Sequence, residues 1–153
     1  MSNFVDNIIV LKTNVFALTP VLVSFFRNLK RKGNNVLLSY FVFPIVLDNK
    51  CKDKLKNLRT TSSLNKVTRD KEIMAGFEER FVFYKDITNR CIQYAVECNY
   101  IKLNDDLSVS VVADNSLFTD TIFSDSLKLA CDLHKIFTKD VINIYYEFGI
   151  KML

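Results

Sequence analysis

The chain has 153 residues, of which 49% are hydrophobic and 25% are charged, and its net charge is +4. This composition is typical of globular domains and excludes a largely disordered chain. The length suits one domain over residues 1–153, which would bury roughly 68–70% of its unfolded surface. Only three glycines and two prolines are present, so long helices are favoured over many short strands.

Neither the start of the chain nor its apolar stretches point to secretion or to membrane insertion. Met1 to Phe4 contain no basic residue, and no signal-peptide core follows them. Two apolar stretches, residues 15–26 and 36–47, are shorter than the about 20 residues that a membrane span needs. We therefore expect a cytoplasmic protein that makes no contact with membranes.

The first helices are predicted from capping residues and apolar periodicity. Asn14, or Thr13 beside it, can cap a helix that follows directly. Thr19 offers a second cap, because Pro20 is tolerated in the first turn of a helix. The apolar period then predicts a helix over residues 22–31, which ends in basic residues and a glycine, the usual stop signals.

Residues 36–47 are predicted to form a central helix. This segment is apolar on nearly all sides, as expected of a helix that is buried on every face. Pro44 lacks a backbone N–H and should kink the helix. Tyr40 and Phe43 are therefore expected to be largely buried.

Residues 50–71 differ in character, because they are polar and basic. Short helices are predicted over residues 52–58 and 64–69. The Ser/Thr run at residues 60–63 provides N-caps for the second of these helices. The apolar anchors of the segment are Leu55, Leu58, Leu64 and Val67.

A long helix is predicted over residues 72–99, with a bend at residues 83–85 as an alternative. Phe77, Phe81 and Tyr84 lie on one face of it. An aromatic face at this spacing is more typical of core packing than of cofactor binding, so Phe77 and Phe81 are expected to be buried.

The remaining elements are a β-hairpin and two helices. Two alternating segments around the turn signal Asn104–Asp105–Asp106 predict a hairpin over residues 101–112. Residues 113–121 are expected to form a loop, and helices follow over residues 126–137 and 139–148. The predicted fold class is mainly α (α+β), a helical domain with one β-hairpin. Short helices, a long helix and a hairpin occur in this order in winged-helix units and in other small α+β domains.

The sequence shows no arrangement typical of catalysis. The only histidine, His134, stands beside Asp132 and Lys135 on a predicted helix, as on a solvated face. The four cysteines lack the spacing of zinc or thioredoxin-type motifs, and Cys91 and Cys98 are expected to pack as small apolar groups. The glycines are too scattered for a phosphate loop. We therefore expect no enzymatic activity, no metal and no cofactor.

Charge is distributed unevenly along the chain. Residues 27–71 hold twelve basic and three acidic residues, a net charge of +9, whereas the rest holds nine basic and fourteen acidic residues, a net charge of −5. Cations beside hydroxyls suit phosphate groups; a solvated face or an acidic protein partner is the alternative. The candidate nucleic-acid-binding residues are Lys50, Lys52, Lys54, Lys56, Arg59, Thr61, Ser62, Lys66 and Arg69.

Six segments, in the same order along the chain, resemble the middle components of bacterial three-component ABC systems. Residues 38–47, LSYFVFPIVL, look like the "LAYLVLPLVLHK" segment of that family, and residues 75–80, AGFEER, are similar to its "VGFAERA" element. The other matching segments are residues 14–16, 59–64, 94–103 and 144–150.

This resemblance implies two partner proteins, a large SMC-like ABC ATPase and a third, effector component, in bacterial defence against phage or plasmids. By analogy with SMC complexes, the chain would be a small winged-helix-type accessory subunit without catalytic residues. We therefore expect a non-catalytic adaptor that docks on the ATPase and helps it to engage DNA, and a homodimer is left open. The alternatives are a stand-alone winged-helix DNA-binding regulator and, with little support from the sequence, an enzyme.

Overall fold

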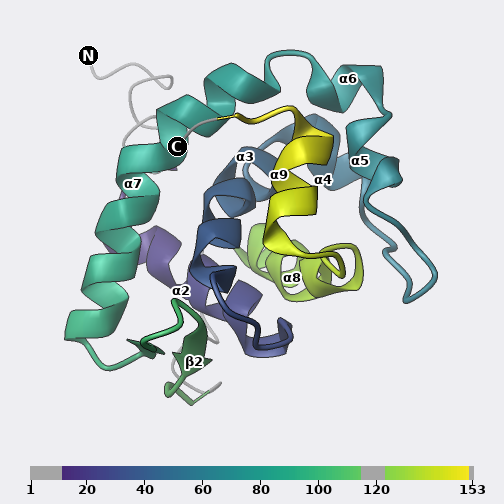
Figure 1. Ribbon diagram of the computed structural model, residues 1–153. Coiled ribbons are helices and arrows are strands. Elements are labelled where there is room, and N and C mark those ends of the chain that lie inside the picture. The colour runs from purple at the N-terminus through teal and green to yellow at the C-terminus, as the bar shows by residue number, and fades with distance from the viewer. Residues whose placement is uncertain (1–11, 115–122, 152–153) are drawn as a thin grey trace, which may run out of the picture.

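The computed structural model describes residues 12–114 and 123–151 and consists of helices and one β-hairpin (Figure 1). This confirms the predicted mainly α architecture; the likeness to a winged helix stays a prediction. The start of the chain and most of the loop expected at residues 113–121 lie outside the described residues. The α-helices are α2 (Val15–Asn28), α3 (Val42–Val46), α4 (Asn49–Lys54), α5 (Asn65–Thr68), α6 (Lys71–Met74), α7 (Phe77–Glu97), α8 (Ser124–Asp132) and α9 (Val141–Phe148).

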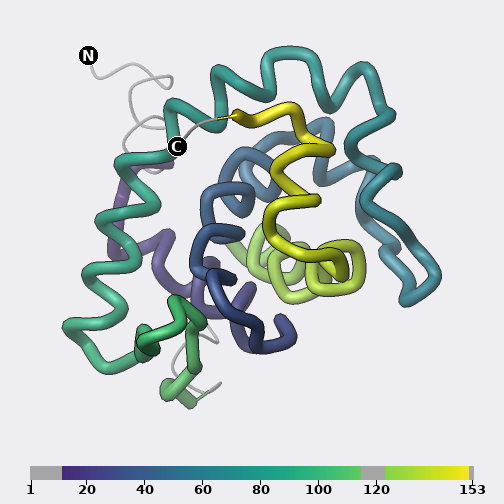
Figure 2. Tube along the Cα trace, in the orientation of Figure 1, coloured from purple at the N-terminus to yellow at the C-terminus, as the bar shows by residue number. Residues whose placement is uncertain are grey.

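Two 3-10 helices, η1 (Asn35–Phe41) and η3 (Leu133–Lys135), complete the helical elements. Figure 2 shows α7 along one side of the molecule and α8 and α9 on the other, with η1 and α3 between them. The element contacts agree, because η1 touches α7 and α9, and α3 touches α7 and α8. No helix in the described part of the chain is long and apolar enough to cross a membrane.

Helix α2 begins at the predicted cap but continues through Pro20. The Asn14 carboxamide oxygen accepts hydrogen bonds from the backbone N–H groups of Phe16 and Ala17, at 3.0 and 3.2 Å. The second cap that we expected at Thr19 is wrong, because its hydroxyl donates to the carbonyl of Val15 at 2.6 Å. Pro20 is therefore an interior residue of one helix, which ends at Asn28 and not at residue 31.

The central apolar segment is helical and buried, but it is not one kinked α-helix as predicted. It divides into η1 and α3. Pro44 is the third residue of α3 and so lies in its first turn, where backbone N–H groups have no intrahelical acceptor. The N–H that proline lacks therefore costs this helix no hydrogen bond. The Ser39 hydroxyl donates to the carbonyl of Val36 at 2.6 Å, a local bond of the kind that competes with regular α-helical pairing. The Phe43 side chain is fully buried, whereas Tyr40 is only half-buried.

The predicted long helix is confirmed over most of its length, with a break near its start. Gly76 has a φ of +70°, which a residue with a side chain rarely adopts, and it separates α6 from α7. The alternative bend at residues 83–85 is wrong, since α7 runs unbroken for 21 residues. Its inner face buries Phe77, Phe81 and Tyr84 as expected.

The hairpin is confirmed as strands β1 (Ile101–Leu103) and β2 (Val109–Val111), which pair antiparallel. Asp106 acts as the predicted turn residue, because its carboxylate accepts from the backbone N–H and the hydroxyl of Ser108 at 3.0 and 2.5 Å. The hairpin docks on the start of η1, where the Asn35 carboxamide oxygen accepts from the N–H of Val109 at 2.9 Å.

Aromatic rings fill the centre of the core. The Phe41 ring stacks on Phe148 with their centroids 4.5 Å apart, and Phe148 stacks on Phe77 at 4.9 Å. The C-terminal helices are confirmed, although the first begins at Ser124 and ends in η3, and the second begins at Val141. Residues far apart in sequence thus share one cluster of buried side chains.

Candidate functional site

The basic segment, residues 50–71, is held on the molecule by its apolar anchors. Leu55, Leu58, Leu64 and Val67 are all at least 95% buried, as predicted. Asp48 caps helix α4, because its carboxylate accepts from the N–H of Cys51 at 3.0 Å. The apolar side chains of the segment face the core, so its cations face solvent. Lys52 is half-buried, and the other predicted lysines and arginines are exposed.

Two of the predicted cations are already neutralised by neighbouring carboxylates. Lys54 lies 2.8 Å from Asp70 and 3.1 Å from Glu72, and Lys56 lies 3.6 Å from Asp53. The hydrogen bond to Asp70 raises the pKa of Lys54, and the same bond lowers the pKa of Asp70. The pairs of Lys54 tie α4 to the start of α6, and all three ion pairs reduce the positive charge that faces solvent.

Two lysines of the segment line a cleft between α4 and α8. Its volume is about 680 Å³, and Lys52 and Lys56 line it together with Lys128 of α8. Three aspartates line the same cleft, so its charged residues balance. The aspartates are Asp53, Asp125 and Asp132.

Four other predicted cations of the segment are exposed to solvent. Lys50, Arg59, Lys66 and Arg69 are exposed, and within residues 12–114 and 123–151 they make no ion pair. We call these four residues the free cations. The candidate residues thus include two lysines that carboxylates neutralise and the four free cations, and their role in binding nucleic acid stays a prediction.

The hydroxyls do not cap a helix as predicted. The Ser62 hydroxyl accepts from the N–H of Arg59 at 3.0 Å, which closes the turn before α5. The residue that precedes α5 is Leu64, and no side chain caps this helix. Thr61 is exposed and Ser62 is half-buried, so the two hydroxyls lie beside the free cations but not at a helix start.

Arg80 makes a contact that sequence reasoning did not assign. Its guanidinium donates to the carbonyls of Ile73, Ala75 and Pro44 at 2.8, 3.0 and 3.2 Å. It also lies 3.9 Å from Asp48 and 5.4 Å above the Phe77 ring. Arg80 therefore fastens the corner between α6 and α7 to the end of α3, and the only signal for it was the AGFEER element.

Cys51 and Cys91 are packed in the core, and His134 lies against the backbone. Burial raises the pKa of the Cys51 thiol to about 12 and that of Cys91 to about 11, so both remain protonated at neutral pH. Nδ1 of His134 lies 2.6 Å from the carbonyl oxygen of Cys131, and the side chain is half-buried and not fully solvated as expected. Among the described residues, no group of three or more His, Cys, Asp or Glu is placed to hold a metal.

The family model for the ABC-three component system middle component 3 matches residues 2–152 of the chain. Comparison with curated proteins and with solved structures found no match. The family match spans nearly the whole sequence and includes every element described above. The resemblance seen in the sequence is confirmed: the chain belongs to the middle component 3 family of ABC-three component systems.

Proposed function

We propose that this chain is a non-catalytic adaptor of a three-component ABC system. It docks on the SMC-like ABC ATPase of that system in the bacterial cytoplasm and works beside a third, effector component. The system acts in defence against phage or plasmids. The family match over residues 2–152 carries this proposal, because it assigns the whole chain to the middle component of such a system.

The side chains of the molecule support a binding role over a catalytic one. Arg80, Asp48 and His134 are engaged with the backbone. The two most buried thiols are protonated, whereas a thiol nucleophile acts as the thiolate. The ATP hydrolysis of the system is therefore assigned to the ATPase subunit.

In this proposal the free cations contact DNA phosphates while the ATPase supplies the rest of the DNA surface. Charge on exposed lysines and arginines attracts the phosphate backbone regardless of base sequence. Affinity should fall with salt by roughly 0.9 in log–log slope for each phosphate that a cation neutralises. Lys54 and Lys56 should contribute less, because carboxylates already neutralise them.

The test measures DNA binding by the complex of the chain with its ATPase, at several salt concentrations. One variant combines Lys66→Glu and Arg69→Glu, and its matched control combines Lys52→Glu and Lys56→Glu. We expect the first to lower affinity and the salt slope more than the control, because it reverses free cations. Equal affinity for wild type and the first variant would show that this surface does not bind DNA.

A second candidate function is a stand-alone winged-helix DNA-binding regulator. The succession of α5, α6, the long helix α7 and the β1–β2 hairpin favours it, because winged-helix units have short helices, a long helix and a hairpin in that order. Copurification separates the two functions. An adaptor retains the ABC ATPase on a tagged copy of this chain, whereas a regulator binds DNA alone and retains no ATPase.

A further inference from the structure

A second cavity lies between the turn that follows α2 and the segment that connects η3 to α9. Its volume is about 310 Å³, at the lower end of the range of about 300–1,000 Å³ for small-molecule sites. Lys30 and Lys32 come from the first of these segments, and His134 and Lys139 come from the second. The Lys32 ammonium donates to the carbonyl of Thr138 at 3.3 Å, so the two segments are in contact. We call this cavity the lysine pocket.

The charged side chains that line the lysine pocket are all cationic. Among the described residues, three lysines line it and no carboxylate does, whereas three lysines and three aspartates line the cleft between α4 and α8. Lys32 pairs with Asp140 at 4.0 Å and Lys139 pairs with Glu147, and both carboxylates lie outside the lining. Three positive and two negative charges leave a net charge of +1. Of the two cavities, only the lysine pocket therefore carries a net charge.

Lys30 supplies the charge that no carboxylate neutralises. Its side chain is exposed and makes no ion pair within the described parts of the chain. His134 adds a polar atom from the other segment. Its Nδ1 lies 2.6 Å from the carbonyl oxygen of Cys131, which can only accept a hydrogen bond, so Nδ1 carries a proton and Nε2 remains for a ligand. Lysines that face a common space repel one another, and an anion between them removes this repulsion.

The buried part of the lining is apolar. Leu38 and Phe137 are 3% and 5% exposed, and the half-buried side chains of Leu29 and Val141 also line the lysine pocket. Walls of low dielectric strengthen the attraction between cations and an anion. A ligand that matches both parts of the lining therefore combines a negatively charged group with an apolar one.

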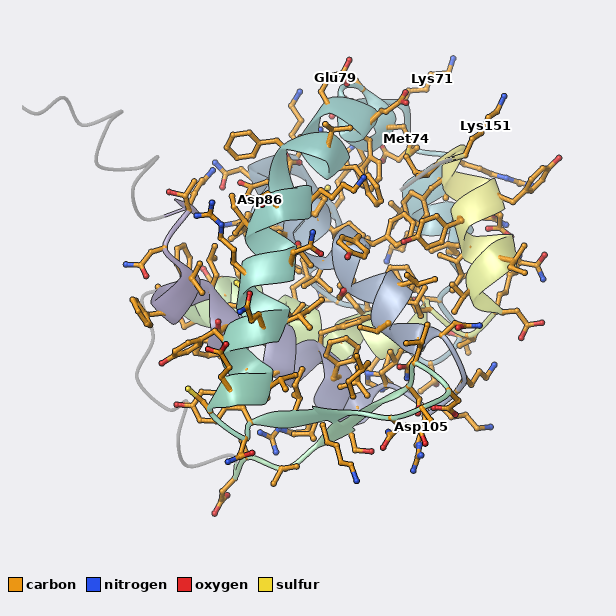
Figure 3. All side chains as sticks on the ribbon, turned by 60° about the vertical axis from the view of Figure 1, so that its left-hand side comes forward. Lys71, Met74, Glu79, Asp86, Asp105 and Lys151 are labelled. Atoms are coloured by element: carbon orange, nitrogen blue, oxygen red, sulfur yellow. The ribbon has the colours of Figure 1, made fainter. Side chains whose placement is uncertain are left out.

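The lysine pocket is next to the point where the hairpin docks. Asn35 lines it, and the Asn35 carboxamide oxygen accepts from the N–H of Val109 in β2. Figure 3 shows Asp105, in the turn of the hairpin, at the end of the molecule opposite Lys71, the last residue of the basic segment. The candidate nucleic-acid-binding residues do not line the lysine pocket, so a ligand there is independent of the proposed DNA contacts.

We propose that the lysine pocket binds a small organic phosphate, with the phosphate among the lysines and an apolar group, such as a nucleobase, against Leu29, Leu38 and Val141. A phosphate monoester carries about two negative charges and three acceptor oxygens, which suits donors that approach from two segments. Lysine binds phosphate well because its ammonium acts as a point charge. A mononucleotide combines such a phosphate with a planar, largely apolar base.

The single histidine makes binding at this site directly observable. His134 is the only histidine of the chain, so its imidazole gives one set of ring signals in NMR spectra of the ¹³C-labelled full chain without a histidine tag. AMP is titrated at constant pH and compared with adenosine, which lacks the phosphate, and with ribose 5-phosphate, which lacks the base. We expect AMP to shift the His134 signals to saturation and each truncated ligand to bind at least about tenfold more weakly.

Variants of Lys30 test whether the phosphate lies in the lysine pocket. Lys30→Glu should weaken AMP binding at least about tenfold, whereas Lys30→Arg should bind AMP about as tightly as wild type. The matched control is Lys128→Glu, because Lys128 is also exposed, makes no ion pair among the described residues and lines the cleft between α4 and α8. Its affinity for AMP should equal that of wild type, and thermal melting of all three variants should be unchanged.

Three results would overturn the inference. If AMP leaves the His134 signals unchanged, the lysine pocket does not bind an organic phosphate. If Lys30→Glu binds AMP as tightly as wild type, the phosphate is bound elsewhere. If ribose 5-phosphate binds as tightly as AMP, the apolar lining contributes nothing and the pocket holds an anion alone.

Discussion

Removal of the Phe77 ring should destabilise the protein strongly. Its side chain is 1% exposed, stacks on Phe148 at 4.9 Å and on Phe41 at 6.4 Å, and lies beneath the Arg80 guanidinium. Phe77→Ala removes these contacts and leaves a cavity where three helices meet. Substitutions of this kind cost about 3–5 kcal/mol of the free energy of unfolding.

The effect can be measured by urea denaturation and by thermal melting. For a chain of this size, about 3–5 kcal/mol corresponds to a fall in Tm of about 6–20 °C. Phe83→Ala is the matched control, because Phe83 lies on the same helix but is 55% exposed. Its cost should be about 1 kcal/mol or less, from the contact with Tyr84 at 4.9 Å. A cost below about 1 kcal/mol for Phe77→Ala would refute the packing argument and indicate a surface position.

Two further predictions concern polar contacts. Arg80→Met should lower the free energy of unfolding, measured by urea denaturation, by about 2–4 kcal/mol, because three carbonyls lose a charged donor. If Arg80→Lys were as stable as wild type in the same assay, this would contradict the need for a forked guanidinium. For Asp70→Asn, we compare stability with wild type at successive pH values. The pKa of Asp70 is lowered in the folded protein, so its charge stabilises the fold at neutral pH and this contribution disappears as pH falls through the lowered pKa. The difference between the two proteins should therefore shrink toward acid, and a difference independent of pH would contradict the role of the Lys54–Asp70 pair.

Local signals in the sequence were sufficient to place most elements. The Asn14 cap, the period of Phe77, Phe81 and Tyr84, and the turn at Asp106 each act within a few residues. Such signals depend on local hydrogen bonding and on which side of a helix is apolar, both of which can be read from spacing. The six matching segments were also sufficient to indicate the family, which the family model confirms.

Tertiary contacts decided how the central apolar segment divides into helices and which carboxylates lie near the lysines. The apolar run around Pro44 is buried whichever helix it forms, so composition could not predict its division into η1 and α3. A lysine count could not show that Lys54 meets Asp70, 16 residues away, or that Lys52 lines the same cleft as aspartates of α8.

The exposed face of α9 shows the same limit of sequence information. Val141, Ile142, Tyr145 and Tyr146 are all apolar or aromatic, and a helix that is apolar nearly all round does not reveal which side will be buried. Packing of Phe148 against Phe41 and Phe77 orients the helix and leaves Ile142 and Tyr146 in solvent. Matching segments and local spacing were thus enough to establish the family and most of the helices of this chain. Contacts between distant residues decided which of its charges and apolar side chains remain available to partners.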